Sequence, residues 1–217
     1  MWFLEPGLTF QSLLARISAI LLIVFLVLPF HEYIRSLVAY KLGDDTPKLL
    51  GKLTINPLVH FSVLGAVSLL LFDFGWAKHT PINPRNLKNP KRDLALIGIA
   101  GPVSYLLAAV VGGLFLNFVP FAQMTDLTTG ISQFIFYFIS INISLAVFNL
   151  IPIAPLDGFL IIEAFIPRKL IEKYYRNSNI ISWIIIFLLL FGFFNQPIAF
   201  LERVLYNLII KFTHISF

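Results

Sequence analysis

Residues 13–40 read LLARISAILLIVFLVLPFHEYIRSLVAY, an apolar run that ends in a cluster of ionisable residues. About 20 consecutive apolar residues are enough for a helix to cross the hydrocarbon core of a bilayer. The preceding residues, Met1 to Phe10, lack the basic start of a cleavable signal peptide, and no small-residue cleavage site follows the run. We therefore expect this run to be a retained membrane-spanning helix.

The whole chain has the composition of a membrane protein. Of its 217 residues, 58% are hydrophobic, 12% are charged and 23 are phenylalanine. A soluble domain averages about 25% charged residues, so this chain has too few to cover a globule with polar side chains. We expect an all-α polytopic protein that is surrounded by lipid bilayer. The absence of cysteine excludes disulfides, thiolate metal ligands and a cysteine nucleophile.

Further apolar stretches of spanning length cover residues 94–120, 132–156 and 180–213. The last is interrupted by Asn195-Gln196-Pro197, so it is either one broken helix or two shorter ones. Residues 59–74 are apolar but short for a span, which favours a re-entrant segment or a short, partly buried helix. No linker or repeat divides the chain, and residues 1–217 are interpreted as one transmembrane domain.

Basic residues predict the orientation. The loops at 75–93 and 167–179 are rich in lysine and arginine, whereas the loop at 120–131 has neither. The positive-inside rule places the first two loops in the cytoplasm and the third outside. The three lysines of segment 41–58 favour the cytoplasmic side as well. Both ends of 59–74 would then be cytoplasmic, so this stretch would not cross the membrane. No basic stripe is interleaved with aromatic residues, so nucleic acid is not an expected partner.

Two short segments have strand-like sequences. Residues 51–58 place β-branched side chains between a glycine and a proline, and residues 76–82 are similar. We expect them to form a small β element at the cytoplasmic face of the bundle. Asp44 and Asp45, just before them, are interpreted as part of a solvated loop.

Charged residues inside membrane spans are costly and are therefore candidates for function. His31, Glu32 and Arg35 occur together, and Asp157 follows the 132–156 run. On a helix, His31 and Arg35 share a face, and Glu32 lies beside it. A zinc protease would have His-Glu-x-x-His, in which two imidazoles bind the metal and the glutamate acts as base. Here Arg35 stands where the second histidine would be.

Several blocks of this sequence resemble the site-2 protease family of intramembrane zinc metalloproteases, in its short bacterial form. The blocks are FHEYIRSLVAYKLGD at 30–44, GKLTINPLVH at 51–60, FGWAK at 74–78, PINP at 81–84, AGPVS at 100–104 and FNLIPIAPLDG at 148–158. They occur in the family's order and cover about residues 14–165. The apolar helices expected at about 180–213 follow this core.

The resemblance implies a site-2-protease-like helical bundle, multi-pass in the bacterial cytoplasmic membrane, that cuts a transmembrane helix with zinc-activated water. It implies His31 and Asp157 as zinc ligands, Glu32 as general base and Asn149 as a substrate contact. His31 and Asp157 must then lie at one depth. This requires the runs 13–40 and 132–156 to point the same way across the membrane.

The sequence departs from the family pattern at three polar positions. Arg35 replaces the second zinc-binding histidine, Ser62-Val63 replaces an Asp-Pro pair, and Tyr105 replaces an asparagine. Catalytic zinc normally has three protein ligands, and a guanidinium has no lone pair to offer. Zinc is the cofactor that the resemblance implies, and the missing ligand argues against it in this chain.

Two hypotheses follow. In the first, Arg35 replaces the metal and pairs with Glu32 or Asp157, and this pseudoprotease binds a transmembrane helix or partner without cutting it. In the second, the chain is an active intramembrane metalloprotease in which His60 or His79 supplies the missing ligand. The first predicts a guanidinium within hydrogen-bond reach of a carboxylate. The second predicts a histidine at bridging distance, with the arginine turned away.

Overall fold

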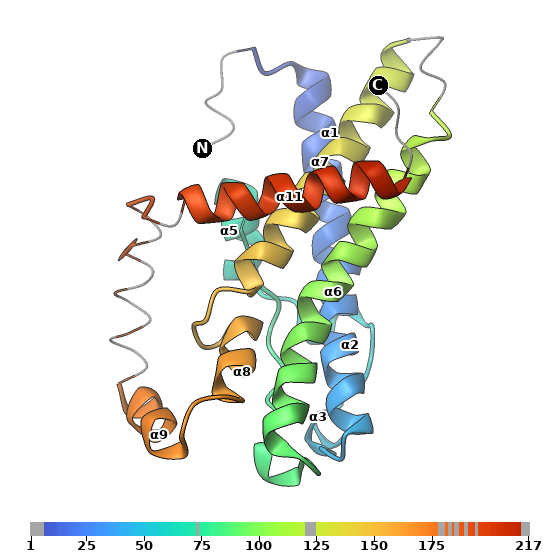
Figure 1. The fold of residues 1–217 in the computed structure, drawn as a ribbon. Helices are drawn as coiled ribbons and strands as arrows, with labels where there is room; N and C mark the ends of the chain where they lie inside the picture. The colour runs from blue at the N-terminus through green and yellow to red at the C-terminus, as the bar shows by residue number, and fades with distance from the viewer. Residues whose placement is uncertain are drawn as a thin grey trace.

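The computed structural model describes residues 7–72, 74–119, 125–177 and 195–213, together with positions 181, 184, 187–188 and 191–193. Every regular element among these residues is helical (Figure 1). The elements are α1 (Phe10–Leu22), η2 (Ile23–Val27), α2 (Leu28–Lys41), α3 (Thr46–Leu49), α4 (Pro57–His60), α5 (Val63–Phe72), η3 (Pro84–Asn86), α6 (Pro90–Leu116), α7 (Asp126–Asn149), α8 (Asp157–Glu163), α9 (Arg168–Arg176) and α11 (Asn195–Thr213).

The first three elements form one continuous helix, Phe10–Lys41. Thr9 caps its start, because Thr9 Oγ1 accepts the Ser12 N–H and Ser12 Oγ accepts the Thr9 N–H, each at 3.1 Å. Pro29 has no N–H to donate to the preceding turn, and the helix widens to a π-helix, η2, just before it. At 1.5 Å per residue, the helix is about 48 Å long. It is therefore longer than the hydrocarbon core is thick, about 30 Å.

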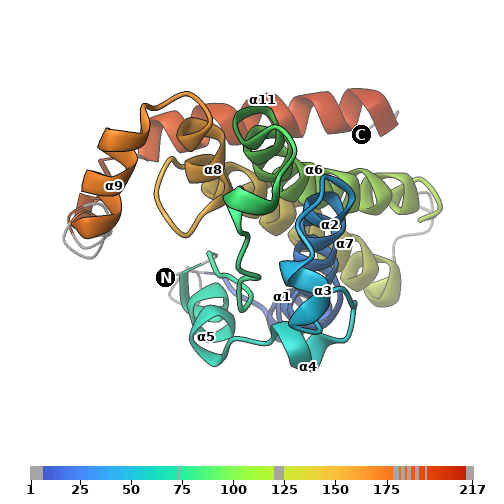
Figure 2. The same cartoon turned by 90° about the horizontal axis from the view of Figure 1, so that it is seen from below.

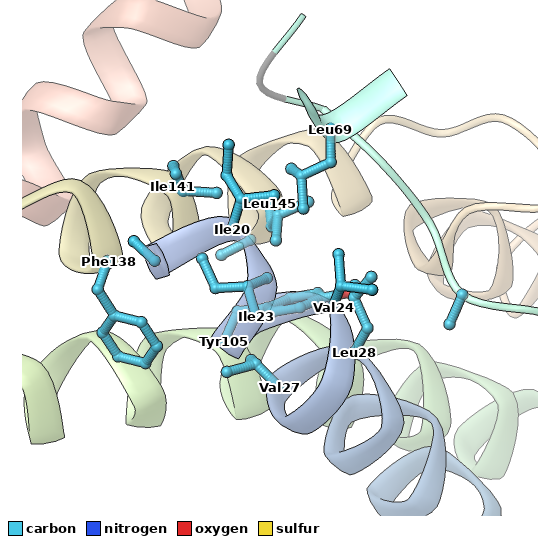
Figure 3. Packing of buried hydrophobic residues seen from close by; sticks show 13 residues of the cluster. Ile20, Ile23, Val24, Val27, Leu28, Leu69, Tyr105, Phe138, Ile141 and Leu145 are labelled. Atoms are coloured by element: carbon cyan, nitrogen blue, oxygen red, sulfur yellow. The ribbon is translucent and has the colours of Figure 1, made fainter. Parts of the chain in front are cut away.

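Within the residues that the structure describes, three helices are long and apolar enough to span a membrane: Phe10–Lys41, α6 and α7. The first helix and α7 begin at the same end of the bundle, and α6 runs in the opposite direction (Figure 1). Their interface is filled by branched and aromatic side chains. Figure 3 shows Ile20, Ile23 and Leu145 packed against Tyr105, with Leu69 of α5 reaching the same cluster. The helical membrane architecture is thus confirmed, with the relative directions expected from the sequence.

α5 accounts for the apolar stretch at 59–74. Its ten residues rise about 15 Å, half the hydrocarbon thickness, so the helix cannot cross. After α5 the chain returns alongside it in close contact. A Cβ on Gly65 would overlap the Trp76 carbonyl, and a Cβ on Gly75 would lie 2.8 Å from Leu69 Cβ. Leu69 is fully buried. The stretch is therefore a short, partly buried helix followed by an extended return.

The prediction of a small β element at 51–58 and 76–82 was wrong. Among these residues, all of them described, there is no strand. Asn56 instead caps α4, and Lys78 N donates to His60 O at 2.7 Å in place of a ladder. Two backbone donors of the extended segment bond carboxylates: Thr80 N donates to Glu32 Oε2, and Asn83 N donates to an Asp44 oxygen. Thr80 and Asn83 therefore donate to carboxylates and not to a second strand.

The apolar region at 180–213 is described mainly over α11. This helix begins at Asn195, where the interruption was expected, and residues 178–194 lie largely outside the described part. α11 lies across α6 and α7 rather than alongside them (Figure 1). Its Glu202 accepts a hydrogen bond from Ser144 Oγ at 2.6 Å, which ties the helix to α7. The assignment of 1–217 to one domain stays a prediction.

Candidate active site

Three elements bring their ionisable side chains to one buried point. α2 supplies His31, Glu32 and Arg35, all at most 3% exposed. The first residue of α8 supplies Asp157, which is fully buried. The extended segment after α5 supplies His79. The packing of α2 and α8 against α6 holds these residues together, because α6 contacts both.

His31 is oriented by α6. Its Nδ1 lies 3.2 Å from the Gly101 carbonyl and 3.3 Å from Ser104 Oγ, which itself donates to that carbonyl at 2.6 Å. A carbonyl only accepts, so this contact assigns the proton to Nδ1 and leaves a lone pair on Nε2. Nε2 faces Asp157 Oδ2 at 3.4 Å. The Tyr105 ring stacks on the imidazole, with centroids 4.3 Å apart.

Arg35 joins the two carboxylates of the cluster. Its Nη1 donates to Glu32 Oε1 at 3.0 Å and to Oε2 at 3.1 Å. Its Nε lies 2.6 Å from Asp157 Oδ1, but the N–H is not aligned for a directed hydrogen bond, since both atoms lack such a partner among the described residues. This second contact is therefore an attraction between charges. Each buried carboxylate thus contacts the same cation.

Glu32 has two further partners from the return segment. Thr80 N donates to Oε2 at 2.9 Å, and His79 Nδ1 lies 2.8 Å from Oε1. Ser36 Oγ donates to Thr80 Oγ1 at 3.1 Å, which holds the segment against α2. Glu32 is thus fixed as an acceptor by donors on three sides. Sequence reasoning missed Thr80, because a backbone N–H leaves no signal in the residue type.

Asp44 anchors the far end of the same segment, contrary to its interpretation as part of a solvated loop. It is fully buried and accepts hydrogen bonds from Asn83 N at 2.7 Å and Asn86 Nδ2 at 2.9 Å, as well as from Thr46. Burial raises the pKa of Asp44, and these hydrogen bonds together lower it below its ordinary value. The segment that carries His79 is therefore held at both ends.

Gly101 permits the close approach of α6 to the cluster. A Cβ at this position would overlap Asp157 Oδ2 and would lie 2.7 Å from both Asp157 Cγ and His31 Cε1. The Ala-Gly-Pro-x-Ser block was noted in the sequence, but without this role. The glycine is needed because any side chain would occupy the space of the carboxylate.

We expect Gly101→Ala to destabilise the protein by about 1–3 kcal/mol, because a well-packed interior must shift to admit the methyl group. The measurement is the thermal unfolding midpoint in detergent. Gly130→Ala on α7 is the matched control, since its nearest neighbour is the flexible end of Gln11 at 3.0 Å. Equal midpoints for the two variants would show that Asp157 has room to move.

Two sequence-predicted residues are engaged elsewhere. Asn149 is buried, and its Nδ2 donates to Leu145 O within α7 at 2.8 Å. His60 Nε2 lies 2.9 Å from the Thr54 carbonyl, to which it donates. His79 alone among the proposed replacement ligands reaches the cluster, where it contacts Glu32 rather than the His31–Asp157 pair.

Comparisons with known proteins identify the family of this chain. The sequence profile of Peptidase family M50 matches residues 119–192. A Bacillus subtilis (strain 168) protein named "Putative zinc metalloprotease YwhC" is 39% identical over 175 residues, which cover 78% of this chain and 79% of the relative. The chain belongs to Peptidase family M50, the site-2 proteases. The resemblance inferred from the sequence is thereby confirmed. No solved structure matches.

The family implies zinc, and the donors present fit it only in part. His31 Nε2 and both Asp157 oxygens lack a hydrogen-bond donor among the described residues, so they are two ligands suited to a cation. The third motif position holds Arg35. Over the part of the chain that the structure describes, no group of three His, Cys, Asp or Glu residues could hold a metal ion. These residues therefore do not fit a catalytic zinc with three protein ligands.

Proposed function

We propose that this chain is a non-hydrolytic site-2 protease homologue that binds a transmembrane helix of a partner protein without cutting it. One observation carries the proposal: the Arg35 guanidinium lies within 3.0 Å of Glu32 and 2.6 Å of Asp157. These are the residues that would act as base and ligand in an active member. A guanidinium stays charged at every physiological pH, so it is a permanent cation at this position.

The guanidinium opposes metal binding in two ways. It supplies no lone pair, and its charge repels a second cation: two unit charges about 4 Å apart repel by about 4 kcal/mol at an effective dielectric constant of 20. It also offsets the cost of two carboxylates in a low-dielectric interior. A chain that keeps both carboxylates but lacks the metal is thus stabilised by Arg35.

The second candidate function is an active metalloprotease that uses His79. The observation in its favour is that His79 Nε2 is buried without a hydrogen-bond partner among the described residues, beside Glu32. Arg35, however, is not turned away as this alternative requires, and lies 3.4 Å from His79 Nδ1. His60 contributes less to this alternative, because Thr54 already engages it.

The proposal includes a location and a partner. Three helices of spanning length among the described residues support a multi-pass membrane protein. We propose that its membrane is the bacterial cytoplasmic membrane, as the family resemblance implies, with the basic loops inside by the positive-inside rule. The resemblance implies that the family's substrates are transmembrane helices, and the helical bundle of this chain supports a partner of the same kind. We propose that such a helix remains intact when bound.

The deciding experiment is the zinc content of the purified protein in detergent, with no chelator added. We expect far less than one zinc per chain, unchanged in His31→Ala, and no cleavage of a co-reconstituted transmembrane peptide. Near-stoichiometric zinc that His31→Ala abolishes would overturn the proposal. In that case His79→Ala would be the next variant, because it tests the replacement ligand directly.

A further inference from the structure

α9 has two faces of different chemistry. Lys169, Lys173 and Arg176 are exposed and are spaced four and three residues apart, so they share one face of the helix. Leu170, Ile171 and Tyr174 form an apolar face. It adjoins the basic face at Leu170, because Leu170 and Lys173 are three residues apart and are neighbours on the helix surface. The acidic residue of this helix, Glu172, lies at the edge of the basic face. A short helix of this kind is typical of the membrane–water interface.

An apolar cavity of about 350 Å³ lies behind the apolar face. Its walls come from α8, the turn after it and α9. The lining includes Phe159, Ile162, Phe165, Leu170 and Tyr174. Phe165 is 78% exposed and Leu170 is 57% exposed, so the cavity mouth is apolar as well. Tyr174 fixes one wall, because its hydroxyl accepts the Ala154 N–H at 3.0 Å and its ring stacks on Phe159 at 4.3 Å.

The position of α9 is that of an interfacial helix. It lies at the end of the bundle that also holds α3 and the start of α6 (Figure 1). Seen from below, it projects to the side of the bundle and is not tucked beneath it (Figure 2). The other basic region, with Arg85, Lys88 and Lys91, leads into the first turn of α6 at this same end. The helix therefore stands where the headgroups of the surrounding leaflet would lie.

We infer that α8 and α9 form a binding site for an anionic phospholipid, with the headgroup phosphate on Lys169, Lys173 and Arg176 and an acyl chain in the cavity. Charge complementarity selects an anionic headgroup over a zwitterionic one. The apolar lining selects a lipid over a free phosphate compound, which would leave that surface exposed to water. The bilayer around three spanning helices supplies the ligand at high local concentration.

The test offers delipidated protein in detergent an equal mixture of phosphatidylglycerol and phosphatidylcholine with matched acyl chains. Mass spectrometry then measures the lipid that the protein retains. We expect phosphatidylglycerol to be enriched at least about 10-fold. Juxtamembrane cations contribute about 1 kcal/mol each, or about fivefold. The variant Lys169→Gln/Lys173→Gln/Arg176→Gln should therefore lose on the order of 10- to 100-fold of that retention.

The matched control removes three charges from the neighbouring basic loop: Arg85→Gln/Lys88→Gln/Lys91→Gln. It should keep the preference for phosphatidylglycerol. Ile162→Trp, which fills the cavity and leaves the charges intact, should lower lipid retention, and excess glycerol 3-phosphate should not displace the lipid. Equal retention of the two lipids, an equal loss in the control, or displacement by glycerol 3-phosphate would each overturn the site.

Discussion

Arg35→His is expected to bind about one zinc ion per chain, where the parent binds far less than one. The substitution completes His-Glu-x-x-His on α2, so two imidazoles on one helix face join the Asp157 carboxylate. It also removes the fixed charge that lies 2.6 Å from Asp157. Both changes favour the metal. The measurement is metal content after purification with added zinc and removal of the excess.

Two variants separate the causes of this gain. Arg35→Gln removes the charge without supplying an imidazole, and it should remain without zinc. Arg35→His/His31→Ala restores only one imidazole and should lose what Arg35→His gains. If Arg35→His stays metal-free while folded, then the scaffold has lost more than one ligand. That result would contradict the view that the guanidinium alone replaced the metal.

Arg35→Leu is expected to destabilise the protein by about 3–5 kcal/mol, the usual cost of removing one partner from a buried ion pair. Glu32 and Asp157 are both 0% exposed, so each would keep a charge that water cannot solvate. Glu32 would retain Thr80 N and His79 as partners, but Asp157 would keep only His31. The thermal midpoint in detergent measures the loss.

A double variant tests the origin of that cost. Arg35→Leu/Asp157→Asn removes a carboxylate together with its cation, and it should recover a large part of the lost stability, because deleting both partners is close to neutral. Arg85→Leu on the exposed loop is the control and should change stability by less than about 0.5 kcal/mol. If the thermal midpoint of Arg35→Leu equals that of the parent, the guanidinium does not offset the cost of burying the two carboxylates.

Much of the fold followed from composition and charge. Long apolar runs in a chain with few charged residues leave only helices in lipid, because every backbone group must be satisfied within the segment. The lysines of 41–58 predicted that both ends of α5 lie on the same side of the membrane. The observed helix has ten residues, too few to cross, which agrees with that prediction. The β element failed for a reason that composition does not reveal. The Thr80 and Asn83 N–H groups bond Glu32 and Asp44, which are distant in sequence.

The candidate site also has a part that the sequence predicted and a part that only the structure shows. Residue types alone named His31, Glu32 and Asp157, because charges at membrane depth are rare and costly. The contribution of Gly101 was hidden, because a glycine matters here through the space that it leaves for Asp157. The choice between His60 and His79 was also open in the sequence. His60 lies at the start of the apolar stretch 59–74 and His79 follows its end, and only the return of the chain along α5 brings His79 to Glu32.

The chain by itself thus determined a helical membrane protein of the site-2 protease family, and it showed that a zinc ligand had become Arg35. Motif spacing on one helix suffices for that, since residues four apart always share a face. Which carboxylates the Arg35 guanidinium contacts was decided by the packing of the helices. Arg35 contacts Asp157, more than a hundred residues away, because α2 and α8 both pack on α6 at its glycines. Local periodicity carries no information on such a contact.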